Sequence, residues 1–247
     1  MKLTKIEPKF IEKQNPKIGL ITLASDFTIE KDFNDVVYGK DVDLYCNRIH
    51  SYNPLTNETL KKMAKDITIV TEDILPDQKL DCIAYGCTSG TIAAGYSSIF
   101  EKVNLAKPNT KVTTPITSAI NALKTLKINK ISIFTPYTNE INQSVINFFK
   151  KENIEISELS YFNIASDLDI GKVDPNYLFD VLIKNDLSNS DALFVSCTAL
   201  PVLSIIEELE KKNGKIVLSS NQALIWDTLK QVDFKNKVAG YGELFNN

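Results

Sequence analysis

The sequence has few residues of the kinds that bind metals. It contains a single histidine, His50, and four cysteines that show no C-x-x-C spacing, namely Cys46, Cys82, Cys87 and Cys197. A tetrahedral zinc site needs several Cys or His ligands at suitable spacing. We therefore expect no metal site, and no Cys-His catalytic pair unless His50 folds beside a cysteine. Unpaired cysteines are typical of free thiols in a reducing cytoplasm.

Long apolar runs and an excess of positive charge are also absent. No apolar stretch approaches the ~18 residues of a membrane span, and the polar stretch 1–17 lacks the apolar segment of a signal peptide. A net charge of −3 gives no basic field that would attract nucleic acid. We expect a cytoplasmic protein whose partner is a small molecule, with neither a membrane nor a nucleic acid as partner. The sequence leaves open whether the protein forms a homo-oligomer.

One pattern occurs twice in the chain, at Asp81–Gly90 and again at Asp191–Leu200. Each copy consists of an aspartate, an apolar run, a small residue and then Cys-Thr. A short run rich in aliphatic and aromatic residues is typical of a buried parallel strand. The two copies therefore predict that Cys87 and Cys197 lie at the carboxyl ends of two buried strands.

A helical pattern follows each copy, over 91–103 and over 199–212. A cysteine between a strand and a helix lies near unpaired backbone N–H groups and the positive end of the helix dipole. Both favour the thiolate, so Cys87 and Cys197 are candidate reactive thiols. We interpret Cys82 and Cys46, which fall within predicted strands, as small buried residues.

The rest of the chain alternates predicted strands with predicted helices in two similar halves. Matched strands begin at 17 and 130, at 81 and 191, and at 111 and 215, which gives offsets of 113, 110 and 104 residues. Three matches in the same order indicate an internal duplication. Further strands are expected over 42–49 and 154–159, and helices over 57–74, 115–126, 139–151, 175–187 and from 220 onward.

Alternating strands and helices predict parallel sheets with crossover helices. The fold class expected is α/β, with two pseudo-symmetric three-layer α/β domains. We expect the first domain to comprise residues 1–115 plus 220–247, and the second residues 116–219. Because ligands bind at the carboxyl ends of parallel strands, the active site should lie in the cleft between the domains, flanked by Cys87 and Cys197.

Two opposed thiols suit a definite chemistry. One thiolate can remove a proton from carbon while the other thiol delivers a proton to the opposite face, which is racemisation without a cofactor. Alternatively, one thiolate adds to a double bond that then rotates. Thr88, Ser89 and Thr198 are expected to cap the helices that follow and to hold a substrate carboxylate there. Tyr137, after a predicted strand, is either an aromatic residue at the rim or a phenol donor to substrate.

At these residues the chain resembles the aspartate/glutamate racemase superfamily. The similar branch holds maleate cis-trans isomerase, arylmalonate decarboxylase and the ectoine-utilisation racemase-like proteins. The last type is the most similar, through Ser-Cys-Thr-Ala-Leu and Ser-Ser-Asn-Gln-Ala. The segments that carry the resemblance are 18–24, 84–90, 135–137, 196–200, 219–223 and 240–242.

This resemblance implies a cofactor-free enzyme with its site between two pseudo-symmetric domains. In the isomerase both cysteines act, and Cys87 and Cys197 match them. In the decarboxylase only the second cysteine is present, with glycine at position 87. Since this chain keeps both cysteines, decarboxylation is the less expected chemistry.

Two aspartates depart from the pattern of the maleate isomerases. Those enzymes carry asparagines that grip the substrate carboxylates, and the matching residues here are Asp26 and Asp167. A carboxylate there repels a carboxylate but attracts an ammonium group, unless the aspartates are loop caps that point to water. The function expected is therefore racemisation or epimerisation of a small amino- or hydroxy-carboxylate, for example a diaminobutyrate-like compound.

Three alternatives stay open from the sequence. One is a maleate-type cis-trans isomerase in which Cys87 adds to the substrate, and another is an arylmalonate-type decarboxylase. The third belongs to a different class, namely a non-catalytic protein that binds a small molecule on the same scaffold.

Overall fold

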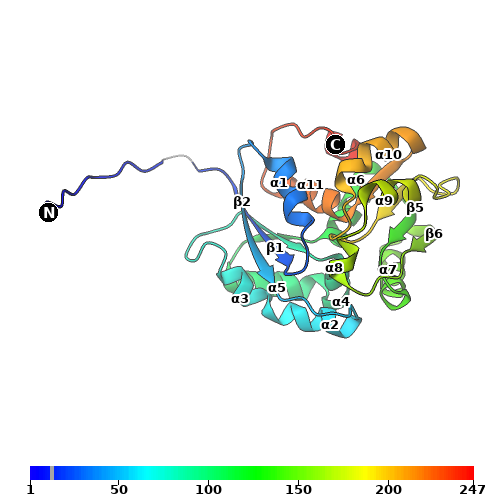
Figure 1. Ribbon diagram of the computed structural model, residues 1–247, viewed down its shortest axis with the longest axis horizontal. Helices are drawn as coiled ribbons and strands as arrows, with labels where there is room; N and C mark the ends of the chain where they lie inside the picture. The colour runs from blue at the N-terminus through cyan, green and yellow to red at the C-terminus, as the bar shows by residue number, and fades with distance from the viewer. Residues whose placement is uncertain (12–13) are drawn as a thin grey trace.

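The computed structural model describes residues 1–11 and 14–247 (Figure 1). These residues form two four-stranded sheets with the strand orders β2-β1-β3-β4 and β6-β5-β7-β8. The strands of the first sheet are β1 (Lys17–Leu23), β2 (Asp43–Ile49), β3 (Cys82–Gly86) and β4 (Lys111–Thr113). Those of the second are β5 (Lys130–Thr135), β6 (Glu155–Tyr161), β7 (Ala192–Val195) and β8 (Ile216–Ser219).

Every strand pair in both sheets is parallel, and the two sheets repeat one order of strands. The central strands β3 and β7 are buried along their whole length, as the apolar runs predict. The edge strands β2 and β6 carry exposed residues, because one side of each has no neighbouring strand. The α/β fold with two parallel sheets is therefore confirmed.

Helices flank the sheets. In the first half of the chain they are α1 (Ile29–Val37), α2 (Asn57–Met63), α3 (Ile67–Glu72), α4 (Thr88–Ala94), α5 (Tyr96–Ala106) and α6 (Pro115–Leu126). In the second half they are α7 (Asn139–Lys151), α8 (Asp167–Ile170), α9 (Pro175–Leu182), α10 (Ile206–Asn213) and α11 (Ser220–Gln231). In the first half, α1 and α11 lie on one side of the sheet and α2, α3 and α5 on the other (Figure 1).

The last long helix connects the two halves. It follows β8 of the second sheet directly and packs against α6, β3 and β4 of the first half. Ser219 caps it and forms a capping box with Gln222, as the Ser-Ser-Asn signal predicts. The division into residues 1–115 plus 220–247 and 116–219 stays a prediction, although its limits coincide with the starts of α6 and α11.

Four local predictions differ from the structure. Helix α1 was not predicted, although Ile29, Phe33 and Val36 repeat at helical spacing and are buried. The predicted helix over 57–74 is divided by a 3₁₀ turn at Ala64–Asp66, and the predicted helix over 91–103 is likewise divided at Gly95, into α4 and α5.

The fourth difference concerns the helix expected after Cys197. A 3₁₀ turn occupies Leu203–Ile205, and α10 begins only at Ile206. Pro201 explains the delay, because a proline lacks the N–H donor and disfavours helical backbone at the residue before it, Leu200. Consequently Cys197 lies in a loop rather than at a helix N-terminus.

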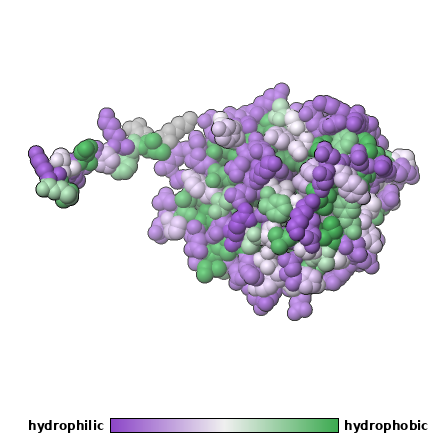
Figure 2. Space-filling model, viewed as in Figure 1, coloured by the Kyte–Doolittle hydropathy of each residue, from purple (hydrophilic) through white to green (hydrophobic). Residues whose placement is uncertain are grey.

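The N-terminal residues extend away from the body of the protein (Figures 1 and 2). Leu3, Ile6 and Phe10 on this segment are 86%, 84% and 85% exposed. Among the described residues, no helix combines the length and the apolar character needed to cross a membrane.

Candidate active site

Cys87 lies at the junction of β3 and α4. It is the N-cap residue of α4, and its sulfur accepts a hydrogen bond from the backbone N–H of Gly90 at 3.2 Å. The Ser89 hydroxyl lies 4.0 Å from the same sulfur. Only 4% of Cys87 is exposed. The local sequence therefore places this thiol where predicted, in a site closed to bulk water.

Cys197 adopts an unusual backbone conformation in the loop after β7. Its φ angle is +97°, a region that residues with a side chain rarely occupy. Its backbone N–H donates to the hydroxyl of Ser220 at 3.0 Å. Cys197 is 4% exposed, like Cys87. A strained residue held by a buried contact is a common feature of functional sites.

The two Cys-Thr turns meet across the two halves of the chain. The Thr88 hydroxyl donates to Ser220 Oγ at 2.9 Å, so Ser220 contacts both turns. The Thr198 hydroxyl donates to the carbonyl oxygen of Gly86 at 3.3 Å. Thr198 therefore does not cap a helix, contrary to the sequence expectation, because no helix begins there. The structure nevertheless brings both turns together at the carboxyl ends of β3 and β7.

Tyr137 follows β5 and lies in the interior of the site. It is 2% exposed, so it is not an aromatic residue at the rim. Burial raises the pKa of its phenol well above the usual value, and the neighbouring Cys197 and Cys87 raise it further. Tyr137 is thus close to both thiols and keeps its proton, as a hydrogen-bond donor to a ligand must.

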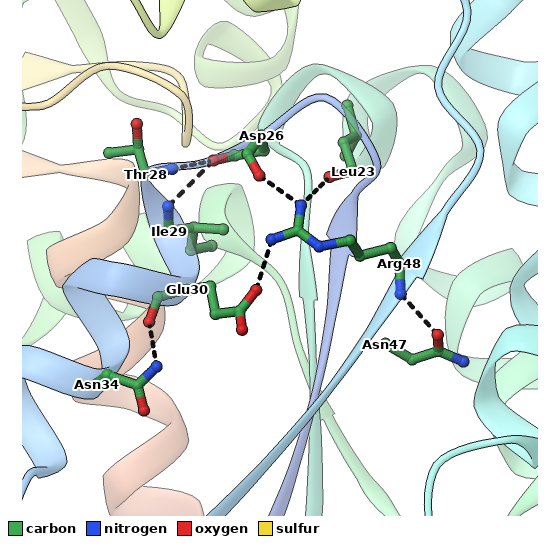
Figure 3. A network of polar contacts seen from close by, with 8 residues as sticks. All are labelled: Leu23, Asp26, Thr28, Ile29, Glu30, Asn34, Asn47 and Arg48. Atoms are coloured by element: carbon green, nitrogen blue, oxygen red, sulfur yellow. Dashed lines mark hydrogen bonds and ion pairs between the residues drawn. The ribbon is translucent and has the colours of Figure 1, made fainter.

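Asp26 lies in the loop between β1 and α1 and is 1% exposed. Its Oδ1 atom accepts hydrogen bonds from the backbone N–H groups of Thr28 at 2.8 Å and Ile29 at 3.1 Å (Figure 3). Its Oδ2 atom is buried and has no hydrogen-bond partner among the described residues. Burial raises the pKa of this carboxyl group, against those two backbone bonds and the nearby Thr198 hydroxyl, which lower it. The carboxylate therefore caps the loop through Oδ1 only, and Oδ2 is buried rather than exposed to water.

Asp167 is the first residue of α8 and is 3% exposed. Its carboxylate accepts a hydrogen bond from the Ser25 hydroxyl at 2.7 Å, and its backbone N–H donates to Asn53 Oδ1 at 3.1 Å. Burial raises the pKa of Asp167 to about 6, and the nearby charge of Asp26 raises it as well. The two aspartates that distinguish this chain thus lie within electrostatic reach of one another.

Sequence reasoning missed a third buried acid, Asp32 on α1. Its carboxylate accepts a hydrogen bond from Asn221 Nδ2 at 2.8 Å, and the same amide donates to the carbonyl oxygen of Thr198 at 2.8 Å. Burial raises the pKa of Asp32 to about 7, and the charge of Asp26 contributes. Asn221 and Ser220 fall in the segment 219–223, which carries the resemblance but whose sequence signal indicates only a helix cap.

Both thiols have raised pKa values, whereas the sequence predicts that their positions favour the thiolate. Burial raises the pKa of Cys87 to about 12 and that of Cys197 well above its usual value, and the charges of Asp167 and Asp26 raise both. The expectation that both positions favour the thiolate is therefore wrong, because burial favours the protonated thiol at each. The Gly90 N–H lowers the pKa of Cys87, but desolvation outweighs one hydrogen bond. Cys197 has no helix N-terminus at all.

The two other cysteines lie outside this site. Cys82 is buried in β3, as predicted, whereas Cys46 is exposed on the edge strand β2. His50 packs edge-on against Tyr52, with ring centroids 4.5 Å apart. Among the residues that the structure describes, no group of three or more His, Cys, Asp or Glu side chains is arranged to hold a metal ion.

Sequence comparison relates the chain to known enzymes. A family model described as arylmalonate decarboxylase matches residues 93–245. The maleate isomerase of Geobacillus stearothermophilus is 27% identical over 244 residues, which cover 93% of this chain and 97% of the relative. The arylmalonate decarboxylase of Bordetella bronchiseptica is 28% identical over 137 residues, or 54% of this chain and 57% of the relative.

Solved structures share the fold. A mutant of Nocardia farcinica maleate cis-trans isomerase with a covalently bound succinylcysteine intermediate superimposes with a TM-score of 0.85 at 22% identity, over 93% of this chain and 98% of that chain. A Pseudomonas putida S16 maleate isomerase variant with maleate has a TM-score of 0.85 at 21% identity, and the match covers 94% of this chain and 98% of that chain. The closer similarity to ectoine-utilisation proteins stays a prediction. The chain belongs to the arylmalonate decarboxylase family, in the branch of the aspartate/glutamate racemase superfamily that also holds the maleate isomerases.

Proposed function

We propose that this protein is a cofactor-independent racemase or epimerase that acts at the α-carbon of a small amino-substituted carboxylate. Cys87 and Cys197 are its acid and base. In one direction the thiolate of one cysteine takes the α-proton, and the thiol of the other gives its proton to the opposite face of the carbanion. The product leaves with the two cysteines in exchanged protonation states, so no co-reactant is consumed.

Other predicted site residues bind the substrate or support the two thiols in this proposal. The backbone N–H groups of Thr88 and Ser89 at the start of α4 hold the carboxylate on which negative charge develops. Tyr137 donates its phenol proton to the same group. Thr198 and Ser89 support the two thiol-bearing turns. Because Cys197 lies in a loop, only one helix N-terminus is assigned to the carboxylate.

One observation carries the choice of an amino substrate, namely the free Oδ2 atom of Asp26. It is buried, unpartnered among the described residues, and close enough to both thiols that its charge raises their pKa values. A buried acceptor without a donor is costly, and a substrate that brings a donor removes that cost. An ammonium group supplies the donor and the opposite charge together, whereas a second carboxylate supplies neither.

An ammonium group would also lower the raised pKa values of the two thiols. Burial raises the pKa of Cys87 and of Cys197, and the charges of Asp167 and Asp26 raise both further, so a thiolate is costly in this site. A bound cation offsets the two carboxylates and lowers both thiol pKa values when the substrate enters. In this proposal the base is generated only when a substrate of the correct charge is present.

The second candidate function is cis-trans isomerisation of a maleate-like diacid through addition of Cys87. Similarity to maleate isomerases over nearly the whole chain favours it. Decarboxylation of an arylmalonate-like acid is favoured by the family model alone. Both substrates carry two carboxylates, and both would place a carboxylate beside Asp26 or Asp167.

The test compares wild type with Asp26→Asn in deuterated water. Proton NMR follows deuterium at the α-carbon of a panel of amino acids, and absorbance follows the loss of maleate. We expect labelling and inversion of an amino acid by wild type, with kcat/KM at least about ten-fold lower in Asp26→Asn because a charge-assisted hydrogen bond of about 1.5–3 kcal/mol is lost. Efficient maleate turnover by wild type would support the second candidate instead, and a protein that binds but never labels its ligand would be a binding protein.

A further inference from the structure

Arg48 on β2 makes three contacts around the Asp26 loop. Its Nη1 atom donates to the carbonyl oxygens of Leu23 at 3.2 Å and of Asp26 at 2.7 Å. Its Nη2 atom lies 2.6 Å from Glu30 Oε2. Figure 3 shows the guanidinium between these groups. One side chain therefore contacts the end of β1, the loop itself and the first turn of α1.

The contacts of Arg48 link the loop to the sheet, which the hydrogen bonds of the Asp26 carboxylate do not do. The bonds from Thr28 and Ile29 orient the carboxylate relative to its own loop. They do not attach that loop to the sheet. The Thr28 hydroxyl ties the far end of the loop to the carbonyl oxygen of Ala199 at 2.8 Å, next to the second Cys-Thr turn. At the near end, the Ala24 N–H donates to the carbonyl oxygen of Ile49 in β2 at 2.8 Å, and Arg48 adds the side-chain link from β2 to the Asp26 carbonyl oxygen. Arg48 therefore contributes to the position of Oδ2 relative to the thiols.

The hydrogen bonds to the two carbonyl oxygens contribute more to holding the loop in place than the ion pair with Glu30 does. Side chains of Arg48 and Glu30 are 42% and 35% exposed, and an exposed pair of this kind contributes little to stability. Arginine offers several N–H donors in a rigid planar fork, so it serves two carbonyl oxygens and a carboxylate at once. Lysine keeps the charge but cannot reproduce this geometry.

We propose that Arg48 is a positioning residue for Asp26, because it fixes the loop 23–28 to β2 and so holds the free carboxylate oxygen beside the two thiols. This structural role requires no substrate. Its effect on turnover of amino substrates rests on the function proposed above.

Several titratable groups lie near Asp26 besides Arg48. Asp32 lies on α1, Asp167 on α8, and the thiols of Cys87 and Cys197 on the two turns; Glu30 faces Arg48 from outside. Among these neighbours Arg48 is the positive one, and its charge opposes the rise in the pKa of Asp26. Removal of Arg48 should therefore raise that pKa further.

The experiment titrates Asp26 directly in Arg48→Gln, Arg48→Lys and wild type. Carbon-13 NMR of labelled aspartate gives the carboxyl titration, and the signal that is missing in Asp26→Asn identifies Asp26. We expect the midpoint to move to higher pH in Arg48→Gln and to stay near the wild-type value in Arg48→Lys. For an amino substrate, KM should rise at least five-fold in both variants while kcat changes less, because the ammonium contact is misplaced.

Two controls keep the result specific. Lys130→Gln removes an ion pair of similar kind on the second sheet, Lys130–Glu155 at 2.7 Å, and should change neither the Asp26 titration nor KM. Glu30→Gln leaves the two carbonyl contacts in place and should also leave KM near the wild-type value. If Arg48→Gln does not fold, Arg48→Lys tests the proposal, because it keeps the charge and removes the fork contacts.

An Asp26 midpoint and KM that are unchanged in Arg48→Gln, or equal changes in Lys130→Gln, would overturn the positioning role. If wild type turns over no amino substrate, the proposed function fails, and the positioning role is then judged by the carbon-13 shift of the Asp26 carboxyl group in Arg48→Lys, which keeps the charge: a shift that differs from wild type supports positioning, and an unchanged shift contradicts it. If amino substrates are turned over but Asp26 is indifferent to Arg48, the function stands and the positioning role fails.

Discussion

Ser220 and Cys197 are joined by a hydrogen bond from the Cys197 backbone N–H to the Ser220 hydroxyl, 3.0 Å long. The same hydroxyl oxygen accepts from Thr88 at 2.9 Å. The first residue of α11 therefore holds both Cys-Thr turns, one from each sheet. It also holds Cys197 in the positive-φ conformation that carries its thiol into the site.

Ser220→Ala should loosen this junction. The buried N–H of Cys197 would lose its acceptor, which costs about 1–3 kcal/mol. We expect the free energy of unfolding, measured in urea, to fall by about that amount, and kcat to fall at least ten-fold because Cys197 is no longer held. Ser144→Ala, which removes a contact to Asn57 away from the thiols, is the control and should keep kcat. Equal kcat in the two variants would contradict the assigned role.

The two thiols should be individually essential. We expect Cys87→Ser and Cys197→Ser each to abolish inversion of the amino substrate, because inversion needs an acid and a base on opposite faces. Exchange of the α-proton from one enantiomer should survive in at most one of them. Chiral chromatography and deuterium labelling measure the two steps separately. Cys46→Ser, on the exposed edge strand, should behave like wild type. Substantial inversion by either serine variant would rule out the two-thiol mechanism.

Because Gly90 has no side chain, the Cys87 sulfur can pack closely against its backbone. A Cβ atom at position 90 would lie 2.7 Å from Cys87 Sγ, 3.0 Å from Met63 Cε and 3.1 Å from Tyr85 Oη. Gly90→Ala should therefore displace the thiol, lower kcat strongly and lower the melting temperature. In the double variant with Cys87→Ala, part of the lost stability should return, because the closest clash is gone. Strictly additive stability losses would show that the sulfur is not the atom displaced.

Asp32 should make stability depend on pH in a defined direction. Burial raises its pKa to about 7 in the folded protein, against the ordinary aspartate value of 3.8, so the folded protein binds this proton more tightly than the unfolded chain does. The resulting penalty is absent below pH 3.8, grows as pH rises towards about 7, and is constant above that. Asp32→Asn keeps an acceptor for Asn221 and removes the charge.

We therefore expect Asp32→Asn to be more stable than wild type at pH 8, and the difference to shrink by roughly 2 kcal/mol at pH 5. Urea unfolding at the two pH values measures it. Asn34→Ala, at an exposed and uncharged position on the same helix, should show no such pH dependence. A pH-independent effect of Asp32→Asn would show that the carboxyl group is not buried as a charge.

Local sequence alone determined the framework. The apolar runs before Cys87 and Cys197 predict buried strands, because their length and composition depend only on neighbouring residues. The repeat predicts two similar α/β halves, in agreement with the common strand order of the two sheets, and the Ser219 signal predicts the start of α11. The placement of both thiols at strand ends follows from the same short-range patterns.

Only the tertiary structure decided what surrounds those thiols. Burial has a larger effect on the pKa of Cys87 than the helix N-terminus has. After Cys197, Pro201 prevents a helix from starting directly. Ser220 and Arg48 act on residues 23 and 22 positions away in the chain, and Asn221 reaches Asp32 across 189 positions. Desolvation and long-range hydrogen bonds depend on which segments pack together, and no local pattern in the sequence encodes that.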